Sequence, residues 1–479
     1  MSGHSTVFER HAPAAAVVDQ SLDGSRHAVF WTEDLPAELR PDRPPLRRTV
    51  TTDLVIVGAG YTGLWTALLA VTRDPGRRVV VVEANRVGWA ASGRNGGFCE
   101  ASLTHGAENG TARWPDEMPT LERLGRANLD AIGAAEAEYG IDVQFERTGQ
   151  LAPAVEPHQL AWLAEWAAEG DRGIVLLDEA AVRREVDSPT YLGGVWEKDS
   201  SALVHPARLA AELARACEER GVEIVERSRA TGIETPASGG VTVVTEHGRV
   251  EADHAVLATN VFPSLLGRNR LMTVPVYDYV LMTEPLTAEQ WAAIGWENRQ
   301  GIGDLANQFH YYRPTRDGRI LFGGYDAVYH YGRRVDPAYE DRPASWRRLA
   351  SHFFTTFPQL EGLRFTHRWA GAIDTSTQFT AFFGTARRGR VAYAAGFTGL
   401  GVGSTRFAAD VMLDLLTGEQ TERTELEMVR RRPLPFPPEP LAAVGIQATR
   451  WSLDRADHRG GRRNALLKTL DALGLGFDS

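Results

Sequence analysis

One segment near the N-terminus constrains the fold more than any other, because an apolar strand runs through a glycine-rich turn into a helix. Residues 53–57 (Asp-Leu-Val-Ile-Val) form a continuous apolar run, typical of a parallel strand buried on both faces. The turn 58–63 (Gly-Ala-Gly-Tyr-Thr-Gly) is followed by a helical pattern over 64–70 and a second apolar strand over 78–83. This order predicts a βαβ unit and an α/β fold.

The glycine spacing in the turn matches that of a nucleotide-binding loop. Gly58 permits the tight turn, Gly60 lets the backbone approach a pyrophosphate, and Gly63 lets the helix pack closely on the strand. Tyr61 and Thr62 are further cofactor-binding candidates of this turn, and the N-terminal N–H groups and partial positive charge of the helix that follows favour phosphate. The turn is therefore expected to hold a dinucleotide.

An acidic residue ends the second strand. Glu83 stands 20 residues beyond Gly63 and is followed by Ala84. A carboxylate at this position can accept hydrogen bonds from both ribose hydroxyls, and it disfavours the 2′-phosphate of NADP. The dinucleotide is therefore expected to be NAD or FAD.

Two further glycine-rich loops favour FAD over NAD. The first is the loop 92–97 (Ser92, Gly93, Arg94, Asn95, Gly96, Gly97), which could follow a longer cofactor beyond its pyrophosphate. The second follows the strand 390–395 and precedes a helix over 405–416. A glycine-lined helix N-terminus suits the pyrimidine edge of a flavin, where reduction places negative charge. The candidate residues of this third loop are Gly396, Thr398, Gly399, Leu400, Gly401 and Val402.

A chain of 479 residues is too long for one compact core, so two or more domains are expected. Sheet-forming segments recur between helical and irregular blocks, which predicts that one sheet-containing domain is interrupted twice by insertions belonging to another. The expected divisions are an irregular N-terminal preface (1–48), the FAD-binding domain (49–105, 201–261 and 389–425), the substrate domain (106–200 and 262–388), and a C-terminal arm (426–479) with helices over 441–457 and 463–473.

Composition excludes several classes of partner. The net charge of −10 argues against a nucleic-acid partner, since phosphate backbones require a concentrated basic surface. No apolar run reaches the ~18–20 residues that span a bilayer, so no membrane association is expected. The two cysteines, Cys99 and Cys217, and the lack of a secretory leader predict a cytoplasmic enzyme.

The first loop and the motif 87–97 (Val-Gly-Trp-Ala-Ala-Ser-Gly-Arg-Asn-Gly-Gly) resemble the D-amino-acid-oxidase-like superfamily of FAD oxidoreductases. This superfamily includes glycine oxidase and sarcosine oxidase, and the motifs are most similar to its gamma-glutamylputrescine oxidase branch. The resemblance covers about residues 30–416 and implies a glutathione-reductase-like two-domain fold. In this fold a Rossmann-type FAD-binding domain is interrupted by a substrate domain whose antiparallel sheet stands over the flavin. The resemblance implies that FAD is bound by Gly58, Gly60, Gly63, Glu83, Ser92, Arg94, the backbone near Ala230, Thr259 and the loop 396–403.

The resemblance also implies an activity, because members of this family oxidise a C–N bond by hydride transfer from carbon to flavin, after which water hydrolyses the imine. The hairpin containing Tyr311 and Tyr312 resembles the strand that borders the family's substrate cavity. Its aromatic rings could form walls for an amine and attract its cation. The alternative is that these rings simply pack the sheet.

The segment 368–374 (Arg-Trp-Ala-Gly-Ala-Ile-Asp), with the candidate Trp369, resembles a strand on which glycine oxidase carries an arginine that clamps the substrate carboxylate. Ile373 stands at the place of that arginine here. The departure favours a primary or secondary amine over an α-amino acid. Asp374 could meet a second cation of the amine, or it could cap a turn.

His105 and Cys99 follow the second loop closely enough to approach a flavin. The histidine could act as a base or as a cation near the ring, or it could be structural. Covalent flavin attachment to Cys99 is conceivable, although a small buried thiol is the alternative. Only two lysines, Lys198 and Lys468, could supply the lysine that activates oxygen in some relatives, so oxygen or another acceptor remains open.

Other functions compete with amine oxidation. An amino-acid oxidase of the glycine or sarcosine type and a flavin dehydrogenase with an acceptor other than oxygen use the same loops. An NAD-dependent dehydrogenase would leave the second and third loops without a role. A flavin-binding subunit that works with a partner chain would suit an exposed C-terminal arm around 433–440.

Overall fold

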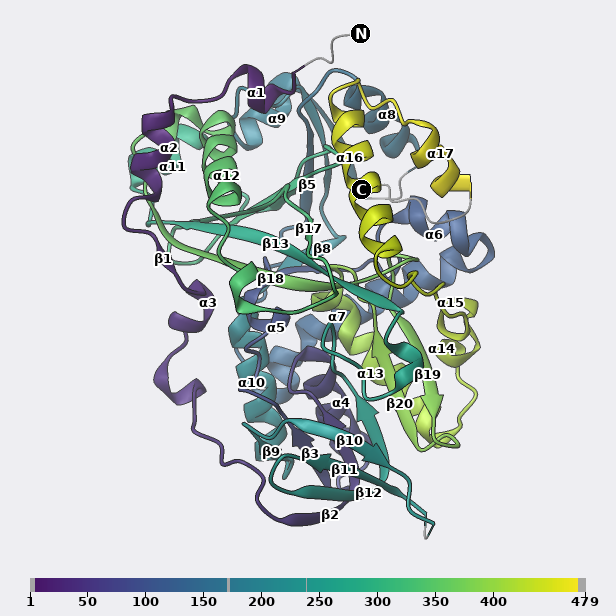
Figure 1. Cartoon of the computed structure of the whole chain (residues 1–479). Helices are drawn as coiled ribbons and strands as arrows, with labels where there is room; N and C mark the ends of the chain where they lie inside the picture. The colour runs from purple at the N-terminus through teal and green to yellow at the C-terminus, as the bar shows by residue number, and fades with distance from the viewer. Residues whose placement is uncertain (1–4, 170–172, 238, 473–479) are drawn as a thin grey trace.

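The computed structural model describes residues 5–169, 173–237 and 239–472. Their strands form two large sheets and one two-stranded sheet. One large sheet, with its helices, occupies the lower half of Figure 1, and the other occupies the upper half. The expectation of an α/β dinucleotide-binding domain combined with an antiparallel-sheet domain is confirmed.

The first large sheet contains a parallel core. Strands β12, β2, β3 and β9 lie side by side in that order, and β20 pairs in parallel with the second half of β12. Leu257 pairs with Val57, which pairs with Val82, so the carboxyl ends of these strands lie along one edge. The strands are β2 (Thr49–Val57), β3 (Val79–Val82), β9 (Glu223–Val225), β10 (Ala230–Glu234), β11 (Val241–Thr245), β12 (Arg249–Leu257), β19 (Phe382–Ala386) and β20 (Val391–Ala395).

Helices cover one face of the parallel strands. The inward side chains of β2 and β3 join a buried cluster with α4 (Tyr61–Arg73), α10 (Pro206–Glu219) and α13 (Gly401–Thr417). The other face packs against side chains of β10, β11 and β12 in a second cluster. Burial on both faces explains the uninterrupted apolar sequence of these strands.

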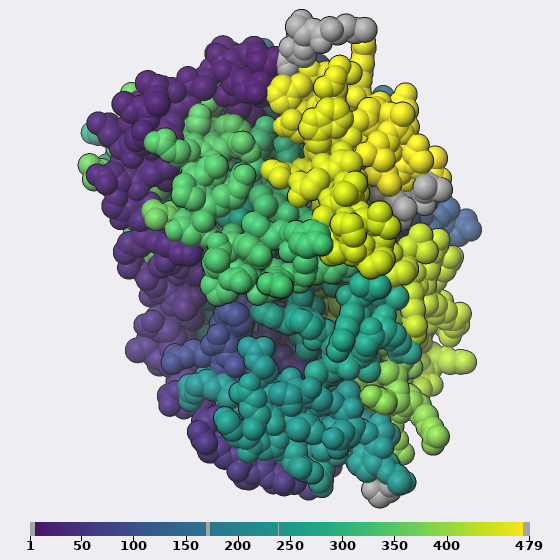
Figure 2. Space-filling view, in the orientation of Figure 1, coloured from purple at the N-terminus to yellow at the C-terminus, as the bar shows by residue number. Residues whose placement is uncertain are grey.

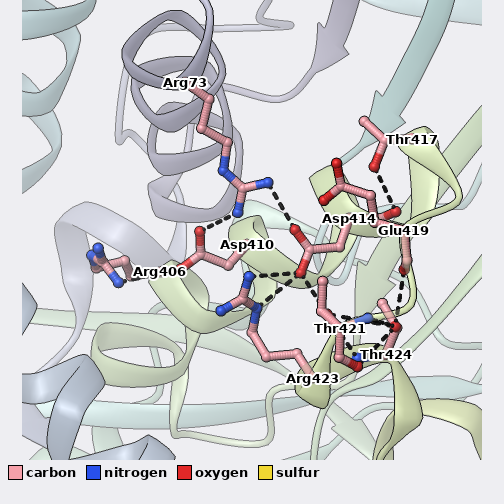
Figure 3. A network of polar contacts seen from close by, with 9 residues as sticks. All are labelled: Arg73, Arg406, Asp410, Asp414, Thr417, Glu419, Thr421, Arg423 and Thr424. Carbon is pink, nitrogen blue, oxygen red and sulfur yellow. Dashed lines mark hydrogen bonds and ion pairs between the residues drawn. The ribbon is translucent and has the colours of Figure 1, made fainter.

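A buried carboxylate ties the helices of this layer together. Asp414 of α13 accepts hydrogen bonds from Arg73 of α4 at 2.8 Å and from Arg423 at 2.7 Å (Figure 3). Thr421 donates a third hydrogen bond to the same carboxylate at 2.9 Å. Since its side chain is 1% exposed, Asp414 stabilises the fold only while these partners are present.

The second large sheet is mostly antiparallel, and its strands follow the order β1, β18, β13, β16, β15, β14, β5, β7 and β6. β17 (Val328–Tyr329) pairs with the other end of β13. The strands are β1 (Arg26–His27), β5 (Gln150–Ala154), β6 (Ile174–Asp178), β7 (Gly193–Glu197), β13 (Thr273–Thr283), β14 (Gly301–Gly303), β15 (His310–Pro314), β16 (Ile320–Gly324) and β18 (Phe365–Ser376).

Helices flank this sheet and the small sheet formed by β4 (Phe98–Glu100) and β8 (Ser201–Leu203). The helix α12 packs on β13 and β16, and α8 packs on β5, β6 and β7. No helix within the described ranges is both long and apolar enough to cross a membrane. Between residues 91 and 356 the helices other than α10 are α5 (Ala91–Arg94), α6 (Ala107–Arg113), α7 (Met118–Tyr139), α8 (Gln159–Glu169), α9 (Glu179–Glu185), α11 (Ala288–Ile294) and α12 (Pro343–Thr356).

The N-terminal preface is less irregular than expected. It forms the short helices α1 (Val7–Arg10), α2 (Ala15–Leu22) and α3 (Phe30–Glu33), and its strand β1 pairs in parallel with β18. Phe8 stacks on His352 of α12 with ring centroids 4.5 Å apart. The sequence did not predict these partners because they lie hundreds of residues away.

Two features differ from the expected divisions. The helix α7 joins the buried cluster of α4, α10 and α13 instead of packing on the second large sheet. β19 pairs with β20, so the flavin-side sheet resumes at Phe382 rather than at residue 389. In the C-terminal arm, α16 (Leu441–Asp457) has the expected bounds and α17 covers Ala465–Ala472, while residue 473 lies outside the described residues. The short helices α14 (Glu422–Glu425) and α15 (Glu427–Arg430) precede them. Figure 2 shows the arm as the yellow surface beside the green part of the substrate domain.

Candidate active site

A cavity of about 940 Å³ lies where the two domains meet. This volume is at the upper end of the ~300–1,000 Å³ typical of ligand pockets. All three glycine loops contribute to its lining, together with strands of the antiparallel sheet and the C-terminal arm. The residues that the loops contribute are Gly60, Tyr61, Thr62, Ser92, Arg94, Asn95, Gly96, Gly97, Phe397, Thr398, Gly399, Leu400, Gly401 and Val402.

The first loop has the close backbone approaches expected of a phosphate-binding turn. Gly58 adopts a φ of 109°, and a Cβ placed on it would lie 2.5 Å from the carbonyl oxygen of Ala258. A Cβ on Gly63 would collide with the carbonyl oxygen of Gly58. Gly60 caps α4, and the Ser92 hydroxyl accepts the N–H of Tyr61 at 3.0 Å. This hydrogen bond joins the first two glycine loops, which line the cavity side by side.

Glu83 lies at the end of β3 but does not line the cavity. Its carboxylate accepts the N–H of Ala59 at 2.8 Å and the N–H of Asn85 at 2.7 Å. Burial raises the pKa of this carboxyl. Glu83 thus stabilises the first glycine loop. Each of its carboxylate oxygens can still accept a further hydrogen bond.

The second loop packs against the antiparallel sheet. A Cβ on Gly96 would lie 2.7 Å from the ring of Tyr311, so only glycine allows this approach. The Asn95 side chain accepts the N–H of Gly97 at 2.8 Å. Arg94 is bound to Glu340 at 2.6 Å and to the carbonyl oxygen of Trp89 at 2.9 Å.

The third loop is held by an acid from the substrate domain. The carboxylate of Asp374 accepts the N–H of Gly396 at 2.5 Å, and burial raises its pKa to about 7. The Thr398 hydroxyl donates to the carbonyl oxygen of Gly396 at 2.9 Å. α13 begins at Gly401, four residues earlier than expected, so Gly401 and Val402 belong to its first turn. These contacts favour the alternative in which Asp374 caps a turn.

His105 lies in the cavity wall beside the third loop. A Cβ on Gly399 would lie 3.8 Å from Cε1 of its ring. Burial lowers the pKa of His105 to about 4, so the imidazole is neutral near pH 7. Burial therefore disfavours a cation at this position, and a base or hydrogen-bonding role remains a prediction.

Only one of the two candidate tyrosines lines the cavity. Successive side chains of a strand point to opposite faces, so Tyr311 faces the cavity and Tyr312 faces the core behind the sheet. Tyr312 is 1% exposed, and its hydroxyl lies 2.6 Å from that of Tyr191. The expectation that Tyr312 forms a cavity wall is therefore wrong.

Trp369 also lies behind the cavity wall. It is 1% exposed, and its indole N–H donates to the carbonyl oxygen of Arg94 at 2.7 Å. It does not line the cavity, whereas Ile373 and Asp374 of the same strand do. The expectation that Trp369 acts directly in catalysis is therefore corrected, because its indole supports the second glycine loop instead.

Several expected cofactor residues lie outside the cavity lining. Gly58, Gly63, Glu83, Ala84, Gly93, Ala230, Thr259 and Gly396 shape or surround the loops, but they do not face the cavity. Cys99 does not line it either, and burial raises the pKa of this thiol to about 12. A buried structural thiol, rather than covalent flavin attachment, is favoured.

The sequence analysis missed four acidic residues in the wall: Glu100, Glu197, Asp278 and Asp304. Asp278 accepts a short hydrogen bond from the hydroxyl of Tyr311, and burial raises the pKa of Asp278 to about 6. A signal existed in the sequence, since Asp278 is a single acid within the apolar strand 273–283. Acidic residues outnumber basic ones in this wall, because Arg94 and Arg450 are the only lysines or arginines among its described lining residues.

The family model of FAD-dependent oxidoreductases matches residues 53–415. The chain is a member of this FAD-dependent oxidoreductase family. A gamma-glutamylputrescine oxidoreductase of Escherichia coli (strain K12) is 32% identical to this oxidoreductase over 389 residues, covering 78% of this chain and 85% of that protein. The resemblance expected from the glycine loops is thus confirmed.

Other relatives of the oxidoreductase are more distant. A glycine oxidase of Bacillus licheniformis is 21% identical over 392 residues, covering 78% of this chain and 95% of that protein. The crystal structure of a glycine oxidase from Geobacillus kaustophilus superimposes with a TM-score of 0.65 at 20% identity, covering 78% and 96% of the two chains. This structure has the same fold.

The three loops fit the FAD of the family. The glycine contacts exclude Cβ atoms at Gly58 and Gly63, leaving the backbone of the first loop open to a pyrophosphate. The third loop leads into the N-terminus of α13, which suits a flavin edge that gains negative charge. The alternative of an NAD-dependent dehydrogenase would leave these cavity-lining loops without a ligand and is not favoured.

Proposed function

We propose that this FAD-dependent oxidoreductase oxidises the C–N bond of a small primary or secondary amine. The observation that carries the proposal is the Asp278–Tyr311 pair, which lies in the cavity wall and packs on the second glycine loop. An amine reaches the site mainly as an ammonium ion, and its proton must leave before hydride can be abstracted from the adjacent carbon. The pair offers a place for that proton.

Asp278 has the properties of such an acceptor. It lies on β13, and its pKa of about 6, raised by burial, leaves it ionised near pH 7 but able to bind a proton. The hydroxyl of Tyr311 and the N–H groups of Tyr279 and Gly324 form hydrogen bonds that stabilise the ionised form. The carboxylate can attract the ammonium ion and accept its proton, directly or through the tyrosine hydroxyl.

Tyr311 holds the pair beside the loop. Its ring fits between Gly96 and Gly323, since a Cβ on either glycine would lie 2.7 Å from ring atoms. The chemistry supplied by bound FAD is acceptance of a hydride from the carbon next to the amine nitrogen. The hydrophobic side chains around the pair exclude water, which favours the neutral amine. Val276, Val280 and Ile373 contribute to this apolar wall.

The absence of a carboxylate clamp supports an amine over an α-amino acid. Ile373 lines the cavity at the place where the family resemblance implies an arginine. The two cavity-lining arginines already have acidic partners: Arg94 binds Glu340, and Arg450 lies 3.4 Å from Asp326. Gamma-glutamylputrescine oxidoreductase, which by its name acts on an amine derivative, supports the same substrate class.

Anaerobic mixing of the purified holoenzyme with amines and amino acids tests the proposal. Loss of the oxidised-flavin absorbance should occur with primary or secondary amines and be much slower with glycine or D-amino acids. The reverse order would refute the reasoning about Ile373. Reduction by no amine at all would refute amine oxidation itself.

The cofactor contacts of the three loops and the electron acceptor belong to the proposal as well. Neither Lys198 nor Lys468 lines the cavity, so oxygen activation by a lysine is not supported. We propose that oxygen or another small acceptor regenerates the oxidised flavin, and admitting oxygen to the reduced holoenzyme distinguishes the two. The free, buried cysteines Cys99 and Cys217 support a cytoplasmic location, which fractionation of cells would test.

A further inference from the structure

A second acidic group lies in the cavity, away from the Asp278–Tyr311 pair. Glu100 ends β4, immediately after the second glycine loop, and its side chain lines the cavity. This side chain is half-buried, and within the described residues its carboxylate accepts no hydrogen bond and forms no ion pair. Burial and the nearby charge of Glu197 raise the pKa of Glu100 to about 7. A half-buried carboxylate that faces a cavity without a cationic partner is available to bind a cation.

Glu197 faces the same part of the cavity from the antiparallel sheet. It ends β7, where it pairs with Gln150 of β5, and both residues line the cavity. Its carboxylate accepts the indole N–H of Trp166 at 2.9 Å, which fixes its position. Both carboxylates therefore lie at one end of the cavity, and neither has an arginine or lysine partner in the part of the chain that the structure describes.

This end of the cavity lies several strands away from Tyr311 along the same antiparallel sheet. The strand order β15, β14, β5, β7 places three inter-strand steps between Tyr311 and Glu197. At about 4.8 Å a step, this corresponds to roughly 14 Å across the sheet. One small amine cannot contact both ends, whereas an elongated molecule can.

We propose that Glu100 and Glu197 form a subsite for a second, protonated nitrogen of the substrate. The substrate class is then an elongated amine with two basic nitrogens, one oxidised beside Tyr311 and the other held as an ammonium ion at Glu100. Asp374, which could have met a second cation, is instead occupied by the N–H of Gly396. This inference rests on the proposed amine oxidation and adds the recognition of the far end of the substrate.

The test compares α,ω-diaminoalkanes of increasing length with n-alkylamines of equal length in anaerobic flavin reduction by the holoenzyme. The concentration dependence of the reduction rate gives a Kd for each compound. Wild type should bind the best diamine about 10- to 100-fold more tightly than its monoamine, the effect expected of one hydrogen-bonded charge pair. Glu100→Gln should remove most of this preference by raising the Kd of the diamine about 10- to 100-fold more than that of the monoamine.

Two further variants make the result specific. Glu197→Gln keeps the acceptor for Trp166 and should weaken the diamine preference in the same direction. Glu165→Gln is the matched control, since Glu165 is exposed on α8 and does not line the cavity. The FAD content and Tm of each variant should equal those of wild type. As a readout independent of turnover, the thermal shift of the oxidised holoenzyme is measured with a diamine of low reactivity, and it should fall in Glu100→Gln.

The outcomes separate the two proposals. If monoamines and diamines reduce wild type with equal Kd, or if Glu100→Gln retains the diamine preference, the subsite is refuted while amine oxidation stands. If Glu100→Gln weakens monoamine and diamine equally, Glu100 acts at the site of oxidation and the second-nitrogen subsite is likewise refuted. If no amine reduces the flavin, the proposed function fails first.

Discussion

The protonation of Asp278 should determine the acidic limb of the pH profile. Its pKa of about 6 lies above the ordinary value for an aspartate because of burial, so the carboxylate is ionised above pH 6 and protonated below it. About nine tenths of the enzyme is then active at pH 7 and about one tenth at pH 5. For the reductive half-reaction, kcat/KM should fall about tenfold between these values.

Two variants identify the group responsible. Asp278→Asn should abolish the limb and lower the limiting rate of flavin reduction about 100- to 10,000-fold, the contribution typical of a positioned base. In Tyr311→Phe the ring packing is retained, but Asp278 loses the hydrogen bond that lowers its pKa, so the limb should move to higher pH.

Stopped-flow reduction at a series of pH values, at constant ionic strength, measures both effects. Asp253→Asn, an exposed aspartate on β12, serves as the matched control. A limb that stays near pH 6 in Asp278→Asn would refute the assignment of the proton acceptor. So would a limb in Tyr311→Phe that moves toward lower pH.

Three further substitutions test the architecture. Gly96→Ala should clash with the Tyr311 ring and cost about 1–3 kcal/mol, observed as lower Tm and weaker FAD retention on dialysis; unchanged retention would contradict the close approach. Asp414→Ala should lower the free energy of unfolding by about 3 kcal/mol in urea titrations, because the buried network loses its acceptor, and a loss below 1 kcal/mol would contradict that role. Asp374→Ala should weaken FAD binding by releasing Gly396, which equilibrium dialysis would detect, whereas Asp374→Asn should retain most of it.

The flavin side of the molecule could be predicted from sequence because its signals are local. The turn 58–63 and the loop 92–97 carry their glycines at fixed spacings, and each stands next to its own strand or helix. The position of these loops at one edge of the sheet follows from the parallel order of the strands. The differences concern element boundaries: α4 begins at Tyr61 rather than residue 64, β19 extends the first sheet back to Phe382, and α13 begins at Gly401 rather than residue 405.

The substrate side could be predicted less well because it depends on pairing between distant strands. Nothing local shows which of Tyr311 and Tyr312 faces the cavity, since that depends on where β15 lies in the sheet. Asp278 of β13 accepts a hydrogen bond from Tyr311 of β15, with β16 between the two strands. Glu100 and Glu197 lie near each other although they belong to different sheets. Such encounters are tertiary, so a single sequence does not reveal them.

The pairing of β1 with β18 has a consequence for how the chain is made. Arg26 and His367 are 341 residues apart, so at ~5–20 residues per second the ribosome delivers the partner strand roughly 17 to 70 s after β1. During that interval Phe30 and Trp31 have Leu35 and Leu39 of their cluster nearby but still lack Trp369, which completes it from β18. Chaperone supply and slower, cooler expression should therefore raise the yield of active enzyme, and neither sheet can be produced as an uninterrupted fragment.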